Sequence, residues 1–374
     1  MRSLHFVQSI EPLQGGGLGQ AALGLHLAMR SIGTSKLITT CGPAFDEVPA
    51  NVIQGIRQGP DAIYYSSKLR QVAASAVAEA DWVHGHGFYV GTNAIIAREA
   101  VKQRKSLCYH AHGFFDPWIL GRSQWKKWMS RFLFEDRNFR NVALWRALTR
   151  KEVGQIRAVG MKQPVEVLPN GIRLEEIDQA ITPEHMAPFE KRLRPKRALF
   201  LGRIHPKKGL DILIDAWRTL AAKYPDWELV IVGPDEGGYL AKVEEMIRHS
   251  DVANSVQLFG SVRGAAKVAA FRSADLFVLS SYSEGFPVAV VEAAAHRLPC
   301  VITTECNFPE LVEADGAWES FPSAEAFSAV LEQALAADDL ERRQRGENGR
   351  ALIEAHYTWP TIAKRMHDIC QDLS

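Results

Sequence analysis

The strongest constraint on this 374-residue chain is an alternation of short apolar stretches with amphipathic ones, which occurs in both halves. Apolar runs of about four to eight residues favour buried strands, and the longer stretches with a helical period between them favour helices. Strands that alternate with helices form parallel sheets wrapped by those helices. The sequence therefore predicts two α/β units in tandem, with a cleft between them.

The predicted elements follow this alternation. In the first half, strands are predicted at 4–10, 36–40, 82–84 and 106–111, and helices at 21–31, 67–79 and 93–104. In the second half, strands are predicted at 198–201, 228–232, 256–259, 276–280 and 300–303, and helices at 210–224, 239–249, 265–273 and 287–296. The extended segment 165–172 and the proline-bounded segment 182–195 predict a linker between the halves.

Composition excludes several other classes of protein. The chain is 47% hydrophobic and 23% charged with a net charge of +1, so no overall field favours nucleic acid as a partner. No apolar run approaches the roughly 18 residues of a membrane span. The cysteines lack C-x-x-C spacing, which argues against a disulfide framework or a structural zinc site and favours the cytoplasm. They are Cys41, Cys108, Cys300, Cys306 and Cys370.

Two glutamates, Glu284 and Glu292, flank the start of a predicted helix that follows a predicted strand. This places them at the carboxyl edge of a parallel sheet, where ligands bind and where a helix N-terminus favours a negative group. Carboxylates there would accept hydrogen bonds from sugar or ribose hydroxyls. The alternative is one helix-start glutamate and one surface glutamate.

A second candidate is the basic loop Gly202–Gly209, between the strand at 198–201 and the helix at 210–224. Its Arg203 can hold phosphate oxygens in a bidentate manner, and Lys208 adds a point charge. Together they would stabilise the charge on a departing diphosphate. A solvated basic loop is the alternative.

The glycine-rich segment 15–19 resembles a dinucleotide fingerprint but fails G-x-G-x-x-G in every register, because Gln20 or Ala22 stands where the last glycine should be. A standard NAD site is therefore disfavoured. What remains is a loop whose backbone could approach a ligand ahead of a helix, or a sharp turn that needs positive φ.

Two histidine pairs end predicted strands, His84 with His86 and His110 with His112. They could ligate zinc if they converged with a carboxylate such as Asp116. The favoured interpretation is that one histidine of each pair packs or hydrogen-bonds structurally, while His112 reaches into the cleft.

The stretch 117–151 mixes aromatic residues with many lysines and arginines. It could form a basic amphipathic surface that rests on a bilayer carrying a lipid-linked acceptor. Equally, the aromatics could be core and the cations solvated. The aromatics are Trp118, Trp125, Trp128, Phe132, Phe134, Phe139 and Trp145.

In combination these residues resemble the retaining GT-B glycosyltransferases of glycosyltransferase family 4, also described as "glycosyl transferases group 1". Glu284 and Glu292 match the family's E-x7-E pattern, and the segment 202–217, GRIHPKKGLDILIDAW, resembles its phosphate loop. The resemblance covers nearly the whole chain. It implies two Rossmann-like, doubly wound domains that face each other across a cleft.

The resemblance also implies roles for single residues. Arg203 and Lys208 would hold the donor diphosphate, Glu292 the ribose and Glu284 the transferred sugar, while His112 matches the family's active-site histidine beside that sugar. The other donor-binding positions that it implies are Gly17, Gly19, Gly233, Pro234, Val262, Gly285, Phe286 and Pro287.

At the level of function, the resemblance implies transfer of a hexose, with retention and without metal or cofactor, from a UDP- or GDP-sugar. The acceptor would be a saccharide or lipid-linked saccharide in bacterial polysaccharide synthesis. Residues 1–171 with the final helix 357–374 would bind the acceptor, and 172–356 the donor. The protein would be cytoplasmic, with peripheral membrane contact through 117–151 and no nucleic-acid partner.

Two departures from the family pattern bear on these expectations. Arg173 stands where the family often has aspartate, and 303–310 lacks the glycine pair found before Pro-Glu in many relatives. Two alternative functions stay open. One is a nucleotide-sugar epimerase of the same architecture, and the other is a non-catalytic sugar-nucleotide-binding protein.

Overall fold

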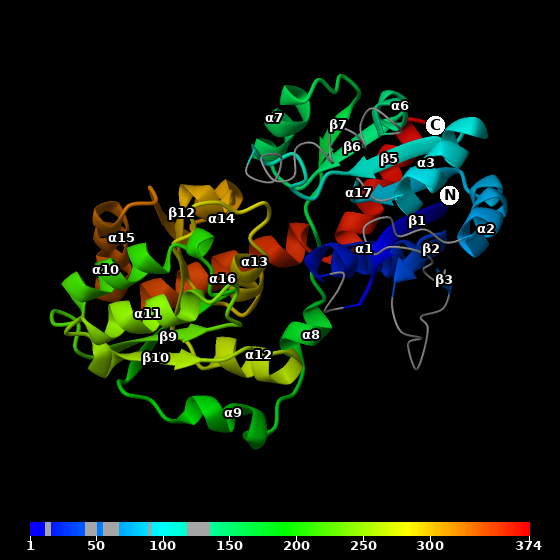
Figure 1. The fold of residues 1–374 in the computed structure, drawn as a ribbon. Helices are drawn as coiled ribbons and strands as arrows, with labels where there is room; N and C mark the ends of the chain where they lie inside the picture. The colour runs from blue at the N-terminus through cyan, green and yellow to red at the C-terminus, as the bar shows by residue number, and fades with distance from the viewer. Residues whose placement is uncertain (12–15, 42–50, 55–66, 89–90, 118–134) are drawn as a thin grey trace. The chain divides into compact units, whose positions relative to one another are not determined.

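The computed structural model describes residues 1–11, 16–41, 51–54, 67–88, 91–117 and 135–374. These residues form two compact units, Met1–Gly171 with Thr358–Ser374, and Ile172–Tyr357 (Figure 1). Each unit is built on one parallel sheet, so the predicted α/β class is confirmed. None of the helices described is both long and apolar enough to span a bilayer.

The N-terminal unit contains a seven-stranded sheet in the order β3-β2-β1-β4-β5-β6-β7. Its strands are β1 (Arg2–Ser9), β2 (Thr34–Cys41), β3 (Val52–Gln54), β4 (Trp82–His86), β5 (Ser106–His110), β6 (Leu144–Ala147) and β7 (Val165–Val167). Its helices are α1 (Gly16–Met29), α2 (Ser67–Glu79), α3 (Gly91–Lys102), α6 (Asp136–Arg140), α7 (Arg150–Ala158) and α17 (Trp359–Asp372). The chain order reverses between β1 and β4, and ligands bind beside the carboxyl ends of such a switch point.

Side chains alternate between the two faces of this sheet. Phe6, Val83 and Tyr109 face α2 and α3 and form one apolar core. On the other face, Trp82 and Cys108 pack under α1 and α17, which lie side by side (Figure 1). The C-terminal helix is thus part of the core of the N-terminal unit.

The second unit contains a six-stranded sheet in the order β10-β9-β8-β11-β12-β13. Its strands are β8 (Lys196–Leu201), β9 (Trp227–Val232), β10 (Val256–Phe259), β11 (Leu276–Leu279), β12 (Cys300–Thr303) and β13 (Ala317–Ser320). Its α-helices are α8 (Leu174–Asp178), α9 (Pro183–Glu190), α10 (Leu210–Leu220), α11 (Tyr239–Arg248), α12 (Gly264–Arg272), α13 (Val288–Ala295), α14 (Pro309–Glu313), α15 (Ala324–Ala336) and α16 (Asp339–His356). Short 3-10 helices are η2 (Pro206–Lys208), η3 (Ala253–Ser255) and η4 (Thr304–Cys306). Here the order reverses between β8 and β11, so the loops after those two strands meet at the switch point.

The boundary between the units falls after Gly171, inside the predicted linker segment 165–172, but both predicted linker segments also contain regular structure. Val165–Val167 is β7, which pairs with β6 as the last strand of the first sheet, because its β-branched residues suit an edge strand. The segment 182–195 contains α9, whose start is stabilised by a reciprocal capping contact between Thr182 and His185 and by Pro183 at its first position. The helix predicted at 210–224 ends earlier, at Leu220.

A buried ion pair fixes the second sheet. Arg197 on β8 and Glu228 on β9 are register partners, and the Arg197 Nε donates to Glu228 Oε1 at 2.7 Å with both side chains fully buried. The same carboxylate accepts from the Leu193 backbone at 2.7 Å, and the guanidinium donates to the Phe189 carbonyl at 3.0 Å. The pair therefore connects the α9 segment to the sheet.

We expect Arg197→Met to lower the free energy of unfolding by about 3–5 kcal/mol, because it leaves the Glu228 carboxylate buried without its countercharge. Urea denaturation would measure the loss. The double variant with Glu228→Leu should recover most of it, since both charges are then removed. A single variant as stable as the native protein would contradict this role.

Candidate active site

The loop after β8 is shaped by Gly209, which has φ +64 and serves as the cap of α10. A Cβ at Gly209 would lie 2.0 Å from the Ser280 carbonyl oxygen, so only glycine fits there. This loop therefore lies close to the end of β11. Lys208, the last residue of η2, is thereby brought near the loop that contains Glu284.

Lys208 and Glu284, predicted from separate motifs, are in direct contact. The Lys208 Nζ donates to Glu284 Oε1 at 2.6 Å, and the Ser281 Oγ donates to the same oxygen at 2.5 Å. The Lys208 and Glu284 side chains are 16% and 10% exposed, so the pair is shielded but reachable by a ligand. This pair lies at the switch point between β8 and β11.

The backbone of Glu284 is held by the segment that departs from the family pattern. Its N–H donates to the Glu305 carbonyl at 2.9 Å, and its carbonyl accepts from Asn307 Nδ2 at 2.6 Å. Asn307 has φ +56, a left-handed conformation that asparagine tolerates better than most residues. An asparagine thus supports the loop that carries Glu284.

Arg203 lies in a neighbouring loop. It is 61% exposed, and its Nη1 donates to Glu236 Oε2 at 2.5 Å. Gly233 is buried beside it, and a Cβ there would lie 1.7 Å from the Gly202 carbonyl oxygen. Pro234 accepts a backbone hydrogen bond from Ile204 at 2.8 Å. The loops after β8 and β9 are thereby packed backbone against backbone.

Glu292 lies in the second turn of α13, where it accepts from Lys267 Nζ on α12 at 2.5 Å. Gly285 is exposed just before that helix, Phe286 and Val262 are half-buried, and Pro287 is buried at the cap position. Each of the cations Arg203, Lys208 and Lys267 is thus paired with a carboxylate.

Of the glycine-rich segment 15–19, the described glycines Gly16, Gly17 and Gly19 belong to the first turn of α1. That helix begins at Gly16, earlier than predicted. Gly17 is exposed, whereas Gly19 is buried, and a Cβ at Gly19 would lie 2.2 Å from the Ser9 carbonyl oxygen. Gly19 therefore allows α1 to pack closely on the end of β1.

His112 lies just after β5 in a left-handed conformation, with φ +46, which is uncommon for a residue other than glycine. The turn is held by the buried carboxylate of Glu152, which accepts from the Gly113 N–H and, at 2.6 Å, from the Leu148 N–H. Sequence reasoning missed Glu152. Its signal was Thr149-x-x-Glu152, a helix-start pattern in which Thr149 caps α7.

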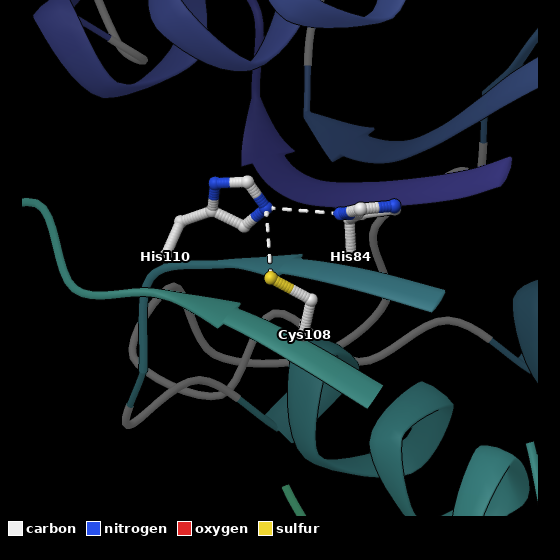
Figure 2. Close-up of side chains that lie close together, drawn as sticks. All are labelled: His84, Cys108 and His110. Carbon is white, nitrogen blue, oxygen red and sulfur yellow. Dashed lines mark hydrogen bonds between the residues drawn. The ribbon is translucent and has the colours of Figure 1, made fainter. Parts of the chain in front are cut away.

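Histidines from adjacent strands meet beneath α1 and α17. Figure 2 shows one group of three possible ligands, His84, Cys108 and His110. A second group, His86, His110 and His112, overlaps it at His110. Within each group the three ligand atoms lie within 4.8 Å of one another. The third ligand atom thus comes from Cys108 in one group and from a further histidine in the other, and not from Asp116, the carboxylate named in the zinc alternative.

The hydrogen bond from Arg146 decides whether a metal fits the group of Figure 2. The Arg146 Nη1 lies 3.0 Å from His110 Nδ1. Burial lowers the pKa of Arg146 to about 10, so it stays charged at neutral pH and can only donate. His110 must then accept at Nδ1 and carry its proton on Nε2, the atom that faces Cys108 and His84. That nitrogen has no lone pair for a metal, so these residues do not fit a metal ion.

Burial also keeps this cluster uncharged. Loss of hydration lowers the pKa of His5, His86 and His110 well below the usual value, and that of His84 to about 3, with repulsion from neighbouring imidazoles and from Arg146 adding to the effect. The pKa of His112 is lowered by the same two causes, first burial and then Arg146.

Two doubly wound units of this kind define the GT-B class of proteins. HepE of Anabaena, solved in complex with UDP and glucose, matches the fold with a TM-score of 0.77 over 100% of both chains, at 19% identity. A family model described as "Glycosyl transferases group 1" matches residues 182–352, and one described as "Glycosyltransferase Family 4" matches residues 25–176. The chain belongs to glycosyltransferase family 4.

Two curated relatives have named activities. A GDP-mannose-dependent monoacylated alpha-(1-6)-phosphatidylinositol monomannoside mannosyltransferase of Corynebacterium glutamicum is 29% identical over 227 residues, 57% of this chain and 58% of that protein. The amylovoran biosynthesis glycosyltransferase AmsD of Erwinia amylovora is 28% identical over 178 residues, 47% and 48% of the two chains. The chain thus spans about half the length of these relatives.

Proposed function

We propose that the protein is a retaining glycosyltransferase that moves a hexose from a UDP- or GDP-sugar to a saccharide or lipid-linked saccharide. The observation that carries this proposal is the Lys208–Glu284 pair at the switch point of the second sheet. It puts a cation suited to phosphate beside a carboxylate suited to sugar hydroxyls. Family membership adds the expectation of transfer chemistry.

In this proposal, Arg203 and Lys208 hold the diphosphate, Glu292 accepts from the ribose hydroxyls and Glu284 contacts the transferred sugar. Backbone groups near the start of α13 complete the sugar pocket, except at Pro287, which has no N–H. Gly233, Pro234 and Val262 frame the base. From the N-terminal unit, the backbone of exposed Gly17 at the start of α1 would approach the diphosphate, and His112 would bond the sugar.

The chemistry that we propose is electrostatic and needs neither a metal nor a cofactor. The bond between the anomeric carbon and the diphosphate oxygen breaks, and Arg203 and Lys208 stabilise the charge that develops on that oxygen. The acceptor hydroxyl attacks the same face of the sugar, and its proton passes to the departing phosphate. Configuration at the anomeric carbon is thereby retained.

For the acceptor, we propose a growing or lipid-linked saccharide of a bacterial polysaccharide pathway. The named activities of the two relatives support this choice, since one acts on a phosphatidylinositol monomannoside and the other serves amylovoran biosynthesis. Peripheral contact with the cytoplasmic membrane face is proposed through 117–151, of which 118–134 lie outside the described residues. Phe139 and Trp145 do not contribute, because both are fully buried.

A panel of UDP-, GDP- and ADP-sugars tests this function. We expect one donor to raise the melting temperature and to be hydrolysed slowly to the nucleoside diphosphate without acceptor. Adding an acceptor should give a product with the donor's anomeric configuration. An epimerised donor would instead identify a nucleotide-sugar epimerase, and binding without any turnover a non-catalytic protein.

The Glu284→Gln variant separates the roles of the two partners. Because Lys208 loses a competing carboxylate, we expect the affinity for the nucleoside diphosphate alone to rise by up to about fivefold, while sugar transfer falls. Calorimetric titration and initial rates would measure both. Glu332→Gln is the matched control, because Glu332 forms a surface ion pair with Lys223 outside the proposed site, and the affinity should not change. Weaker diphosphate binding in Glu284→Gln would contradict the assignment of Glu284 to the sugar.

A further inference from the structure

Five histidines of the N-terminal unit form two stacked rows of imidazoles on the α1 and α17 face of the sheet. The registers His5↔His84 and His86↔His110 bring them together from β1, β4 and β5. His5 stacks on His84 with ring centroids 4.5 Å apart, and His86 stacks on His110 at 4.0 Å. The arrangement is sequence-specific, because it needs histidine at every second position of β4 and of the β5 end.

One row leads from the interior to the candidate catalytic histidine. The His5 Nδ1 lies 3.1 Å from His86 Nε2, and the His86 Nδ1 lies 3.2 Å from His112 Nε2. His5 and His86 are fully buried, whereas His112 is only half-buried. Since its Nε2 is bonded to His86, His112 has only Nδ1 left for a ligand.

The other row has its direction fixed by charge. Arg146 donates to His110 Nδ1, so His110 donates from Nε2 toward His84 Nδ1 at 3.2 Å. This row does not include His112 in its hydrogen bonds. It therefore provides an internal comparison for the row that does.

The direction of the first row follows from its buried end. A neutral imidazole has one N–H and one bare nitrogen, so both hydrogen bonds of the row must point the same way. Among the described residues, the His5 Nε2 has no hydrogen-bond partner. If each histidine of the row donated its N–H inward, from His112 toward His5, the His5 Nε2 would be a buried N–H without an acceptor. If each donated outward, from His5 toward His112, the His5 Nε2 would only have an unused lone pair. A buried unpaired donor is avoided more strictly than an unpaired acceptor.

The other row carries that cost, because the direction imposed by Arg146 leaves the proton of His84 on Nε2, which has no partner among the described residues. No cation donates a hydrogen bond to the described members of the first row, so that row takes the direction that avoids the cost.

We propose that His86, backed by His5, is a positioning residue that holds His112 in the tautomer with its proton on Nδ1. His112 then presents an N–H to its ligand and accepts from His86 at Nε2. An N–H suits an oxygen of the sugar or diphosphate, which a bare nitrogen would not bond unless that oxygen carried a proton. The ligand's identity rests on the proposed function, but the tautomer does not.

The test is nitrogen-15 NMR of the full chain with labelled histidine, in which two-bond proton–nitrogen correlations distinguish the two neutral tautomers. The spectrum of His112→Gln assigns the His112 signals. In the ligand-free native protein we expect the Nδ1–H pattern for His112. This measurement needs no further variant, and an Nε2–H pattern would overturn the inference.

Variants then test whether His86 is the cause. In His86→Phe we expect His112 to shift toward the Nε2–H form that free imidazole side chains prefer. We expect kcat to fall about tenfold, which is the loss expected for one hydrogen bond of ordinary strength. The KM for the donor should change little. His86→Asn should restore both the tautomer and kcat, since its amide nitrogen takes the place of His86 Nδ1 and can donate to His112. His84→Phe, an equally buried change in the other row, should keep the native tautomer and rate.

An unchanged His112 spectrum in His86→Phe would contradict the positioning role. If the tautomers behave as expected but no nucleotide sugar perturbs the His112 signals, the positioning role stands and the proposed function fails. The two ideas therefore fail in different experiments.

Discussion

Replacing Lys208 by alanine is expected to lower turnover by about 10²- to 10³-fold, the loss typical of removing one charge-stabilising donor from an active site. Lys208 is the shielded cation at the switch point of the second sheet, 2.6 Å from Glu284. The effect should fall on kcat, because charge on the diphosphate grows as the bond to the sugar breaks. Stability should change by only about 1 kcal/mol, since Ser281 still bonds the carboxylate.

Turnover at saturating donor, together with the melting temperature, would measure this prediction. Lys223→Ala is the matched control, because Lys223 is a lysine of the same unit whose ion pair with Glu332 lies on the surface. It should leave turnover unchanged. Native transferase activity in Lys208→Ala would remove Lys208 from the mechanism, and an equal loss in both variants would point to a general charge effect.

The second large effect is a steep loss of stability in acid. His5, His84, His86 and His110 are fully buried, and each has a pKa below the usual 6.5. In the unfolded chain they regain that value and bind protons that the folded protein excludes. The free energy of unfolding is therefore unaffected by these four groups above about pH 6.5, and it decreases as the pH falls below that value. Each imidazole lowers the free energy of unfolding by up to about 1.4 kcal/mol for each pH unit below its unfolded pKa, so the four together lower it by up to about 6 kcal/mol per pH unit.

Urea unfolding of the N-terminal unit at pH 7.5 and pH 5.0 would measure this loss. Buried Glu152 acts in the opposite direction, because burial raises its pKa, but it is a single group. His84→Phe should make the dependence on pH shallower by about a quarter, since one of the four proton-binding groups is removed. Equal free energies of unfolding at the two pH values would show that the buried imidazoles accept protons in place.

Much of the second unit could be predicted from the sequence, because its signals are local. The strand from Cys300 to Thr303 was predicted without error, and the loops that carry Lys208 and Glu284 each follow a predicted strand. Those two residues were expected at one sheet edge from separate motifs. Their direct contact could not be predicted, since it depends on the close approach of Gly209 to Ser280.

The first unit was harder to predict, because its deciding contacts are not local. Trp145, on β6, was read with the cations around it as part of an amphipathic basic surface, with core as the alternative, and the structure places it in the core. Gly19 was read as part of a ligand-approaching loop, but its first effect is to let α1 pack on Ser9. The histidine pairs were noticed, yet their stacking with His5 depends on strand order and register. Hydrophobic periodicity in the sequence predicts neither the strand order nor the register.

A crystal structure with the nucleotide sugar that stabilises the protein most would test the central claim most directly. We predict that its diphosphate lies within hydrogen-bond distance of Arg203 and Lys208, with the ribose on Glu292 and the sugar on Glu284. The Lys208–Glu284 bond should lengthen or break as Lys208 turns to phosphate. A nucleotide bound elsewhere, with that ion pair intact, would contradict the account.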